Sequence, residues 1–195
     1  MKLVTYQKDG SARPGLLVGE DLATAEVVDM LRAFAWVDRR RGGARDEHTI
    51  AAQYGASVLA FIERAGEARP VAEEALAAHG RGELPRSGEA GPIVLAAEDV
   101  ALLAPIPRPP SMRDGYAFRQ HVETARRNRG LEMIPEFDQF PVFYFTNHQA
   151  VIGPGPLRVK PRHLERLDFE LEAAIVVGRE ARDLSAAEAD DAIFG

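Results

Sequence analysis

A regular alternation of side chains over residues 167–178 constrains the fold more than any other feature of the sequence. Every odd position from Leu167 to Val177 is apolar, and the even positions change from acidic to apolar at Ala174. Alternation with a period of two residues predicts a β-strand. Because the even face becomes apolar midway, we expect the far end of this strand to be buried on both faces, with carboxylates beside the buried region.

Two of these carboxylates point the same way. In a strand, Glu170 and Glu172 lie about 6.6–6.8 Å apart on one face. Like charges held this close repel, so either a positive group lies between them or one of them keeps its proton. A hard divalent cation with oxygen ligands is the first candidate for that group. A solvated acidic edge explains these residues equally well, and the two readings stay open at this point.

Composition narrows the class of protein. The chain has 195 residues, 46% of them hydrophobic, which is enough for one medium or two small domains with a genuine core. The net charge of −6 argues against nucleic acid as the main partner. The absence of cysteine excludes disulfides, thiolate metal sites and a cysteine nucleophile. With no signal-peptide pattern and no apolar run of membrane-spanning length, we expect a cytoplasmic protein without a membrane partner.

The first hundred residues predict a small module of strands and helices. A Lys8–Gly10 turn between two apolar runs predicts a β-hairpin, and Asp29 is placed to cap a helix. A glycine- and proline-rich stretch at 81–92 predicts a loop or linker. The expected strands are residues 3–7, 15–19, 94–96 and 100–103, and the expected helices are residues 27–34, 49–65 and 70–78.

Two segments of this region permit more than one interpretation. The basic, glycine-containing run Asp38–Arg45 is either an anion-binding patch or a surface turn. The proline-rich run Pro105–Pro110 is stiff and extended, so it either docks on an SH3-like partner or connects two domains rigidly. We favour the turn and the connector, and we place the boundary between the two modules near residue 104.

The second half predicts a helix that carries polar side chains. Ser111 to Asp114 has the pattern of a capping box, and the helix is expected to run to Arg129 and stop at Gly130. Asp114 and His121, seven residues apart, would then lie above one another on one helical face. On these residues alone, His121 is either a packed core histidine or a catalyst. Other expected elements are an aromatic run at 140–146, a turn at 150–155 and a last helix opened by a capping box at 185–188.

Six motifs follow one another in this half: Arg-Asp-Gly-Tyr-Ala-Phe-Arg-Gln-His at 113–121, Arg-Gly at 129–130, Phe-Pro-Val-Phe-Tyr-Phe at 140–145, Gly-Pro-Gly at 153–155, Leu-Asp-Phe-Glu-Leu-Glu at 167–172, and Gly-Arg-Glu-Ala-Arg-Asp-Leu-Ser-Ala-Ala-Glu-Ala at 178–189. In this order they resemble the fumarylacetoacetate hydrolase family. The resemblance extends from about residue 100 to the end. Residues 1–100 resemble, less specifically, the variable N-terminal module of bacterial members.

The resemblance implies a fold. It implies an α+β, β-rich chain in which a small N-terminal α/β module, residues 1–104, precedes the first part of a mixed β-roll or barrel catalytic domain, residues 105–195. In the family, further ligand motifs and barrel strands follow the Ile-Phe-Gly at 193–195. The resemblance therefore implies a chain truncated after the Glu-x-Glu region, completed as a homodimer or by a missing C-terminal segment.

The resemblance also implies site residues. The family's metal ligands, which bind Mg²⁺ or Ca²⁺, match Asp114, Glu170 and Glu172. The general base matches His121. The substrate-binding positions match Tyr116, Arg129 and Tyr144.

These residues imply a reaction on a small oxo-acid. Diketo acids chelate a hard cation, which polarises the carbonyl group and stabilises an enolate. The leading expectation is a metal-dependent hydrolase that cleaves a carbon–carbon bond in a fumarylacetoacetate-like or acylpyruvate-like diketo acid, as in aromatic catabolism. One alternative is a truncated, non-catalytic subunit or interaction module. Another is an isomerase or decarboxylase of a related oxo-diacid.

Overall fold

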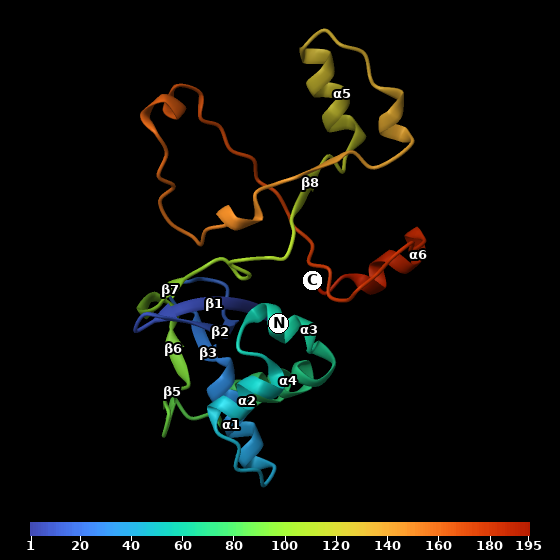
Figure 1. Cartoon of the computed structure of the whole chain (residues 1–195). Coiled ribbons are helices and arrows are strands. Elements are labelled where there is room, and N and C mark those ends of the chain that lie inside the picture. Colours follow the sequence, from blue (N-terminus) through green and yellow to red (C-terminus); the bar gives the residue numbers. More distant parts are fainter. The chain divides into compact units, whose positions relative to one another are not determined.

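The computed structural model describes all residues, 1–195, as two compact units. The first unit contains residues 1–106 and 152–195, and the second contains residues 107–151. The first unit is built on a five-stranded antiparallel sheet with the order β6-β3-β2-β1-β7 (Figure 1). These strands are β1 (Lys2–Lys8), β2 (Ser11–Val18), β3 (Glu26–Asp29), β6 (Val94–Ala96) and β7 (Ala101–Leu102). The expected mixture of helices with an antiparallel sheet is confirmed.

The hairpin of β1 and β2 forms where the sequence predicts it. Asp9 and Gly10 both have positive φ angles, 50° and 83°, and Lys8 pairs with Ser11 across them. Positive φ at both central residues is the geometry of a type I′ turn, whose twist matches that of the strands. In the next strand, a Cβ at Gly15 would lie 2.7 Å from the Val27 side chain. Glycine at this position therefore lets the sheet pack closely.

Four helices pack beside this sheet in the first unit (Figure 1). They are α1 (Met30–Arg40), α2 (Glu47–Tyr54), α3 (Val58–Glu63) and α4 (Ala65–Gly80). Phe34 contacts Tyr54 edge-on with ring centroids 5.4 Å apart, and it also contacts Phe61. These buried rings join three of the helices in one core.

Two helix predictions in this region are wrong. Residues 26–29 form strand β3, and the helix expected from residue 27 begins only at Met30, because this segment pairs with β2 and β6. The single helix expected over 49–65 is two helices, α2 and α3. Gly55 separates them with a φ of +98°, and a Cβ there would lie 2.6 Å from the Ala60 carbonyl carbon.

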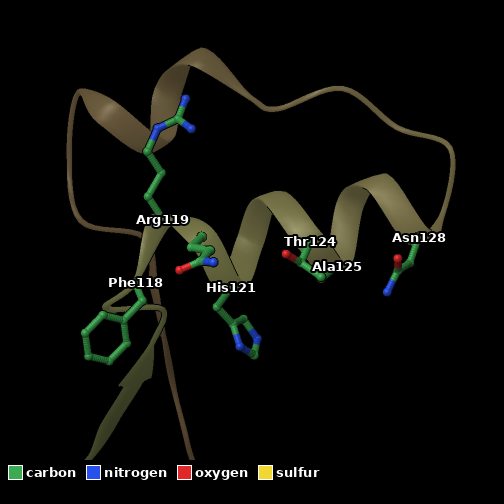
Figure 2. Close-up of a pocket in the computed structure, with 7 residues that line it drawn as sticks. Phe118, Arg119, His121, Thr124, Ala125 and Asn128 are labelled. Atoms are coloured by element: carbon green, nitrogen blue, oxygen red, sulfur yellow. The ribbon is translucent and has the colours of Figure 1, made fainter.

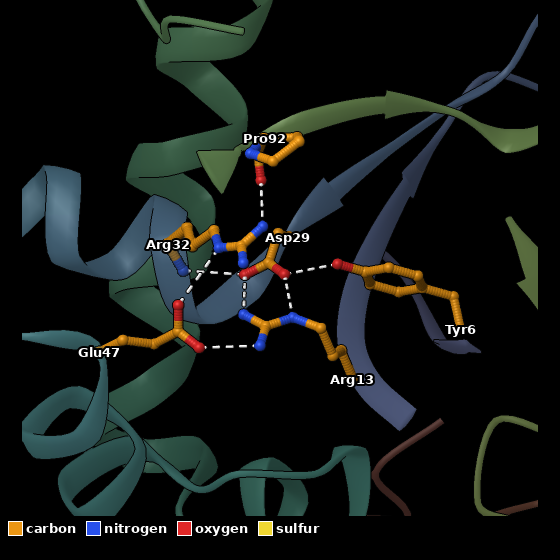
Figure 3. A network of polar contacts seen from close by, with 6 residues as sticks. All are labelled: Tyr6, Arg13, Asp29, Arg32, Glu47 and Pro92. Atoms are coloured by element: carbon orange, nitrogen blue, oxygen red, sulfur yellow. Dashed lines mark hydrogen bonds and ion pairs between the residues drawn. The ribbon is translucent and has the colours of Figure 1, made fainter. Parts of the chain in front are cut away.

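Asp29 is fully buried at the junction between β3 and α1. Its carboxylate accepts hydrogen bonds from the Tyr6 hydroxyl at 2.5 Å and from Arg13 at 2.5 and 3.0 Å (Figure 3). It also caps α1, because the backbone N–H of Arg32 donates to Oδ1 at 2.9 Å. One side chain thus joins β1, β2, β3 and the first turn of α1, and the predicted capping role is confirmed.

A second carboxylate extends this network to α2. Glu47 binds Arg13 at 2.8 Å and Arg32 at 3.2 Å, and Arg32 also donates to the Pro92 carbonyl (Figure 3). Hydrogen bonds to Asp29 raise the pKa of Arg13, and burial together with Asp29 raises the pKa of Tyr6. Arg13 therefore stays charged and Tyr6 stays a neutral donor across the physiological range.

Hydrogen bonds between Asp38 and Arg45 fix the conformation of residues 38–45. Asp38 is buried, and its carboxylate accepts from the Arg45 backbone at 2.9 Å and from the Arg45 guanidinium. Gly43 passes so close that a Cβ there would overlap both Asp38 carboxylate oxygens. Because Arg45 is satisfied inside the chain, this structure favours the structural reading of the run.

The alternating stretch 167–178 is the clearest departure from the sequence prediction. Residues 167–175 form no strand, and Phe169 and Leu171 are 87% and 97% exposed. A strand forms only where a neighbour supplies hydrogen-bond partners. Only the far end has one: Val176 exchanges backbone hydrogen bonds with the last two residues of the chain, at 2.7 Å each.

This far end packs on the helices. Phe194 lies edge-on against Phe61, with ring centroids 6.3 Å apart, and the Arg69 guanidinium lies 4.9 Å from its ring. Val176 and Phe194 are partly buried against the same core. Partial burial is therefore confined to the end of the alternating stretch, at Val176 and Gly178, and does not reach Glu170.

The second unit contains a hairpin and a helix. Strands β8 (Arg113–Gly115) and β9 (Phe143–Phe145) pair antiparallel, and α5 runs over Arg119–Asn128. The helix expected from residue 111 is wrong in its first turns, because residues 113–115 pair with the aromatic run. Gly130, with a φ of +69°, follows the helix end as predicted.

The remaining elements are short. They are β4 (Ser87–Gly88), β5 (Gly91–Pro92), α6 (Ala186–Ala189) and the 3₁₀ turns Ala97–Asp99, Pro135–Asp138, His148–Ala150, Pro161–Arg166 and Asp190–Ala192. The capping box predicted for the last helix is confirmed, since Ser185 and Glu188 bond reciprocally. None of the helices combines the length and the apolar character needed to cross a bilayer.

We expect Asp29→Asn to destabilise the chain by about 3 kcal/mol, because it leaves the Arg13 guanidinium beside a neutral group in a buried site. The measurement is urea unfolding followed by circular dichroism. The exposed Asp99→Asn is the matched control and should change stability by less than about 0.5 kcal/mol. Equal stabilities of the two variants would contradict the role given to Asp29.

Asp38 should make stability depend on acid pH. Hydrogen bonds from Arg45 hold the pKa of Asp38 below its usual range. Its contribution is therefore complete above the unfolded-state pKa of about 4 and is lost as pH falls through the folded-state pKa. We expect Asp38→Asn to remove that part of the pH dependence, measured as the urea midpoint between pH 6 and pH 3. An unchanged slope against the wild type would exclude this assignment.

Candidate functional site

The β8–β9 hairpin fixes a carboxylate against a phenol. Asp114 and Tyr144 are cross-strand partners, so their side chains lie on the same face of the hairpin. The Tyr144 hydroxyl donates to Asp114 Oδ2 at 2.6 Å. Asp114 is half-buried, and a carboxylate has two oxygens, each able to accept more than one bond. The pair is an oriented oxygen donor beside an oriented hydroxyl.

A second pair follows directly along the chain. Tyr116 stands two residues after Asp114, where β8 ends, and its ring stacks on the His121 imidazole. The two ring centroids are 5.6 Å apart and the planes differ by 28°. The stack limits rotation of the imidazole, while His121 itself remains exposed to solvent. The prediction that Asp114 and His121 lie on one helix is wrong, because Asp114 lies on β8 and α5 begins only at Arg119.

The helix α5 borders a shallow cleft of about 650 Å³ (Figure 2). Among the lining residues, Phe118 lies at one end and Asn128 at the other, with His121 between them. The cleft is lined by Phe118, Arg119, Gln120, His121, Thr124, Ala125 and Asn128. Among the predicted site residues, His121 lines this shallow cleft.

The other predicted residues lie elsewhere. Arg129 is the C-cap of α5, where its backbone N–H donates to the carbonyls of the last turn, and it does not line the cleft. Glu170 and Glu172 belong to the first unit and lie on its exposed, extended stretch, whereas Asp114 belongs to the second. No group of three or more ligating side chains is gathered in the structure. The set of three carboxylate ligands stays a prediction.

The chemistry of these donors fits a hard cation. Asp114, Glu170 and Glu172 supply only carboxylate oxygens, the ligands that Mg²⁺ and Ca²⁺ prefer. The Tyr144 hydroxyl orients Asp114, as outer partners commonly orient metal-binding carboxylates. The residue types are therefore suited to a divalent cation.

Of the lining residues, sequence reasoning named only His121 as a site residue, and the polar residues it missed include Thr124 and Asn128. They stand three and seven positions after His121, which places all three on one face of the helix. The spacing was visible in the sequence, but neutral side chains at these positions gave no chemical signal. Arg113, which lies over Phe145 at 4.8 Å on the opposite face of the hairpin, was likewise not singled out.

Comparison with known proteins identifies the second half of the chain. Residues 111–195 match the family model described as fumarylacetoacetate (FAA) hydrolase C-terminal. Residues 111–195 are thus similar to the fumarylacetoacetate hydrolase family, whose members are generally enzymes. The resemblance stated from the motifs is therefore confirmed.

Individual relatives cover different parts of the chain. An uncharacterised protein of Pyrococcus horikoshii is 36% identical over 93 residues, which are 43% of this chain and 38% of the relative. A Mycobacterium tuberculosis protein is 31% identical over 147 residues, 75% of this chain and 51% of the relative. The mitochondrial oxaloacetate tautomerase Fahd2a of Rattus norvegicus is 24% identical over 148 residues, 75% of this chain and 41% of the relative. The chain thus spans about half or less of the length of these relatives.

We expect Gly115→Ala to separate Asp114 from Tyr144. A Cβ at Gly115 would lie 2.7 Å from the Val142 carbonyl oxygen, so β8 and β9 could not keep their spacing. Amide hydrogen exchange across β9 should accelerate at least about tenfold. Gly66→Ala is the matched control, since nothing lies within 4 Å of the added methyl group and alanine favours the helix. Unchanged exchange in Gly115→Ala would contradict this packing.

Proposed function

We propose that this chain takes part in divalent-metal-dependent cleavage of a carbon–carbon bond in a fumarylacetoacetate-like or acylpyruvate-like diketo acid. Similarity to the family supports a hydrolase-type or tautomerase-type reaction. The observation that carries the proposal is the grouping of four motif residues at one hairpin and helix: Asp114, Tyr116, His121 and Tyr144. All four side chains carry a group that can accept or donate a proton.

The proposed ligands of the cation are Asp114, Glu170 and Glu172. When bound, Mg²⁺ or Ca²⁺ would supply the positive charge that polarises the substrate carbonyl and stabilises an enolate. Tyr144 orients the Asp114 carboxylate through its hydroxyl. Arg129 is proposed to bind a substrate carboxylate, as arginine does with paired N–H groups.

His121 is the proposed general base. Its imidazole is exposed beside the cleft and stacks on the Tyr116 ring. An imidazole nitrogen takes a proton from the water whose oxygen bonds to the carbonyl carbon. The carbon–carbon bond then breaks, and the departing carbon gains a proton. The products are a carboxylic acid and a shorter oxo-acid.

Tautomerisation is the second candidate. It is favoured by the similarity to the rat oxaloacetate tautomerase over 75% of this chain. Here the same imidazole would move a proton between the carbon and the oxygen of a 2-oxo-diacid, with no water consumed. Decarboxylation of a related oxo-diacid would begin with the same polarised carbonyl. Because the three reactions share their first interactions, only product analysis separates them.

Partners are also proposed. A small-molecule oxo-acid is the proposed substrate, and a homodimer or a complementing C-terminal segment is the proposed assembly. The exposed apolar side chains within residues 167–175 would be covered in such an assembly. The competing proposal is a non-catalytic subunit or interaction module.

The test follows diketo-acid absorbance with the purified chain and Mg²⁺ or Ca²⁺, using an acylpyruvate, a fumarylacetoacetate-like diacid and oxaloacetate. Loss of absorbance with two smaller acids as products indicates hydrolysis, whereas conversion between keto and enol forms indicates tautomerisation. Asp114→Asn, Glu170→Gln and His121→Ala should each lower the rate at least about a hundredfold, the scale of a lost base or metal ligand.

Glu165→Gln is the control for the carboxylate variants, because Glu165 is exposed and lies outside the proposed site. It should keep the wild-type rate. Calorimetry of Mg²⁺ binding provides a second readout, in which Asp114→Asn and Glu170→Gln weaken binding and His121→Ala does not. No turnover and no cation binding by the wild type would leave the non-catalytic proposal.

A further inference from the structure

We infer that the N-terminal module anchors the stretch carrying Glu170 and Glu172 through Phe194, so that cation binding and this anchor strengthen one another. The inference rests on the proposed function, because it takes the two glutamates as ligands of a divalent cation. It gives residues 1–106 a part in assembling the site. Phe194 and Gly178 are positioning residues in this arrangement, since they act through the glutamates.

The anchor is a pair of short antiparallel segments at the end of the first unit. The Val176 N–H donates to the Gly195 carbonyl, and the Phe194 N–H donates to the Val176 carbonyl, at 2.7 Å each. The Gly178 N–H donates to the Ala192 carbonyl at 2.8 Å. Glycine at 178 lets the segments meet, because a Cβ there would lie 2.7 Å from the Cβ of Phe194. A methyl group at this position would therefore push the two segments apart.

One aromatic ring fixes this pair of segments to the helices. The Phe194 ring lies edge-on against Phe61 of α3, with centroids 6.3 Å apart, which is a favourable geometry for two aromatic rings. The Arg69 guanidinium of α4 lies 4.9 Å from the same ring and adds a cation–π contact. Phe61 is fully buried in the core of the module, so Phe194 rests on a well-packed part of the chain. All of these residues belong to the first unit.

The stretch before the anchor is held again at Gly153. A Cβ at Gly153 would lie 2.6 Å from the Leu102 carbonyl oxygen, so this glycine packs directly on the module. Between the two points, residues 154–175 form no strand and no α-helix. Glu172 stands four residues before Val176 and 19 residues after Gly153. The Phe194 anchor is therefore much the nearer of the two along the chain.

The length of chain to the anchor sets how far the glutamates can move. A chain without regular structure extends about 5–6 Å × √n from a fixed point. Glu172 thus stays within about 11 Å of the anchor, but would range over about 24 Å if Gly153 alone held it. The volume open to the ligand pair grows about tenfold without the anchor, and its effective concentration falls by the same factor. Loss of the anchor should therefore weaken cation binding about tenfold, and by reciprocity the cation should strengthen the anchor equally.

The first measurement is calorimetry of Mg²⁺ binding to the full chain. Phe194→Ala removes the ring and Gly178→Ala separates the paired segments, so each should raise the Kd about tenfold. Phe194→Tyr keeps the ring and should keep the wild-type Kd. Leu164→Ala removes an exposed apolar side chain from the same part of the chain, and this matched control should change nothing.

Amide hydrogen exchange follows the anchor without any turnover. Saturating Mg²⁺ should slow exchange of the Val176 and Phe194 N–H groups about tenfold in the wild type. In Glu170→Gln the same addition should have no effect. The Thr24 N–H, which lies in an exposed turn of the module, should exchange at one rate throughout.

Turnover separates an anchor from a ligand. At saturating Mg²⁺, Phe194→Ala should reach the wild-type rate with the diketo acid, whereas Glu170→Gln should not. Equal Mg²⁺ affinity of Phe194→Ala and the wild type would overturn the inference and leave the proposed function standing. Unchanged exchange at Val176 in both Phe194→Ala and Gly178→Ala would overturn it as well.

The remaining outcomes concern the wild type. Slower exchange of the anchor with Mg²⁺, but no turnover, would support the anchor and overturn only the proposed catalysis. A wild type that turns over substrate with Mg²⁺ while exchange at the anchor stays the same would overturn only the anchor. A wild type that binds no Mg²⁺ would overturn both.

Discussion

The N-terminal module depends on one buried charge, the carboxylate of Asp29. A charge without solvent is stable only when every oxygen is paired, and Asp29 meets this requirement with donors from β1, β2 and α1. The same hydrogen bonds also hold the Arg13 and Tyr6 side chains in place. Glu47 adds α2 to the network through Arg13. A sheet that could slip in register is thereby fixed against its helices at one point.

The family part of the chain is organised by a different principle. In α5 only Val122 is buried, so packing contributes little to the second unit. Local polar and aromatic contacts replace it: Tyr144 on Asp114, Tyr116 on His121, and Arg119 on Asp138. The first two of these contacts join residues of the motifs themselves. The short spacing between Asp114 and His121 is thus a geometric requirement, since a strand, a turn and a helix start must fit between them.

The sequence allowed the hairpin, the Asp29 cap and the last capping box to be predicted because each depends on neighbours in the chain. Predictions from the sequence were wrong where a segment pairs with strands that are distant in the chain. Val27 and Val28 join a sheet and not a helix because β2 and β6 flank them. The alternation at 167–175 has the right period for a strand, but this part of the chain supplies no pairing edge. The resemblance to the family pointed to Asp114 and His121. Neutral residues such as Asn128 gave no chemical indication of a site in the sequence, and only the structure places Asn128 beside the cleft.

The choice between hydrolysis and tautomerisation turns on what His121 faces when substrate is bound. Both reactions need one proton acceptor beside a polarised carbonyl, so the base alone cannot decide between them. Hydrolysis needs a water between the imidazole and the carbonyl carbon, whereas tautomerisation needs the substrate carbon itself within reach of the imidazole. The reaction type therefore depends on whether water has room beside His121.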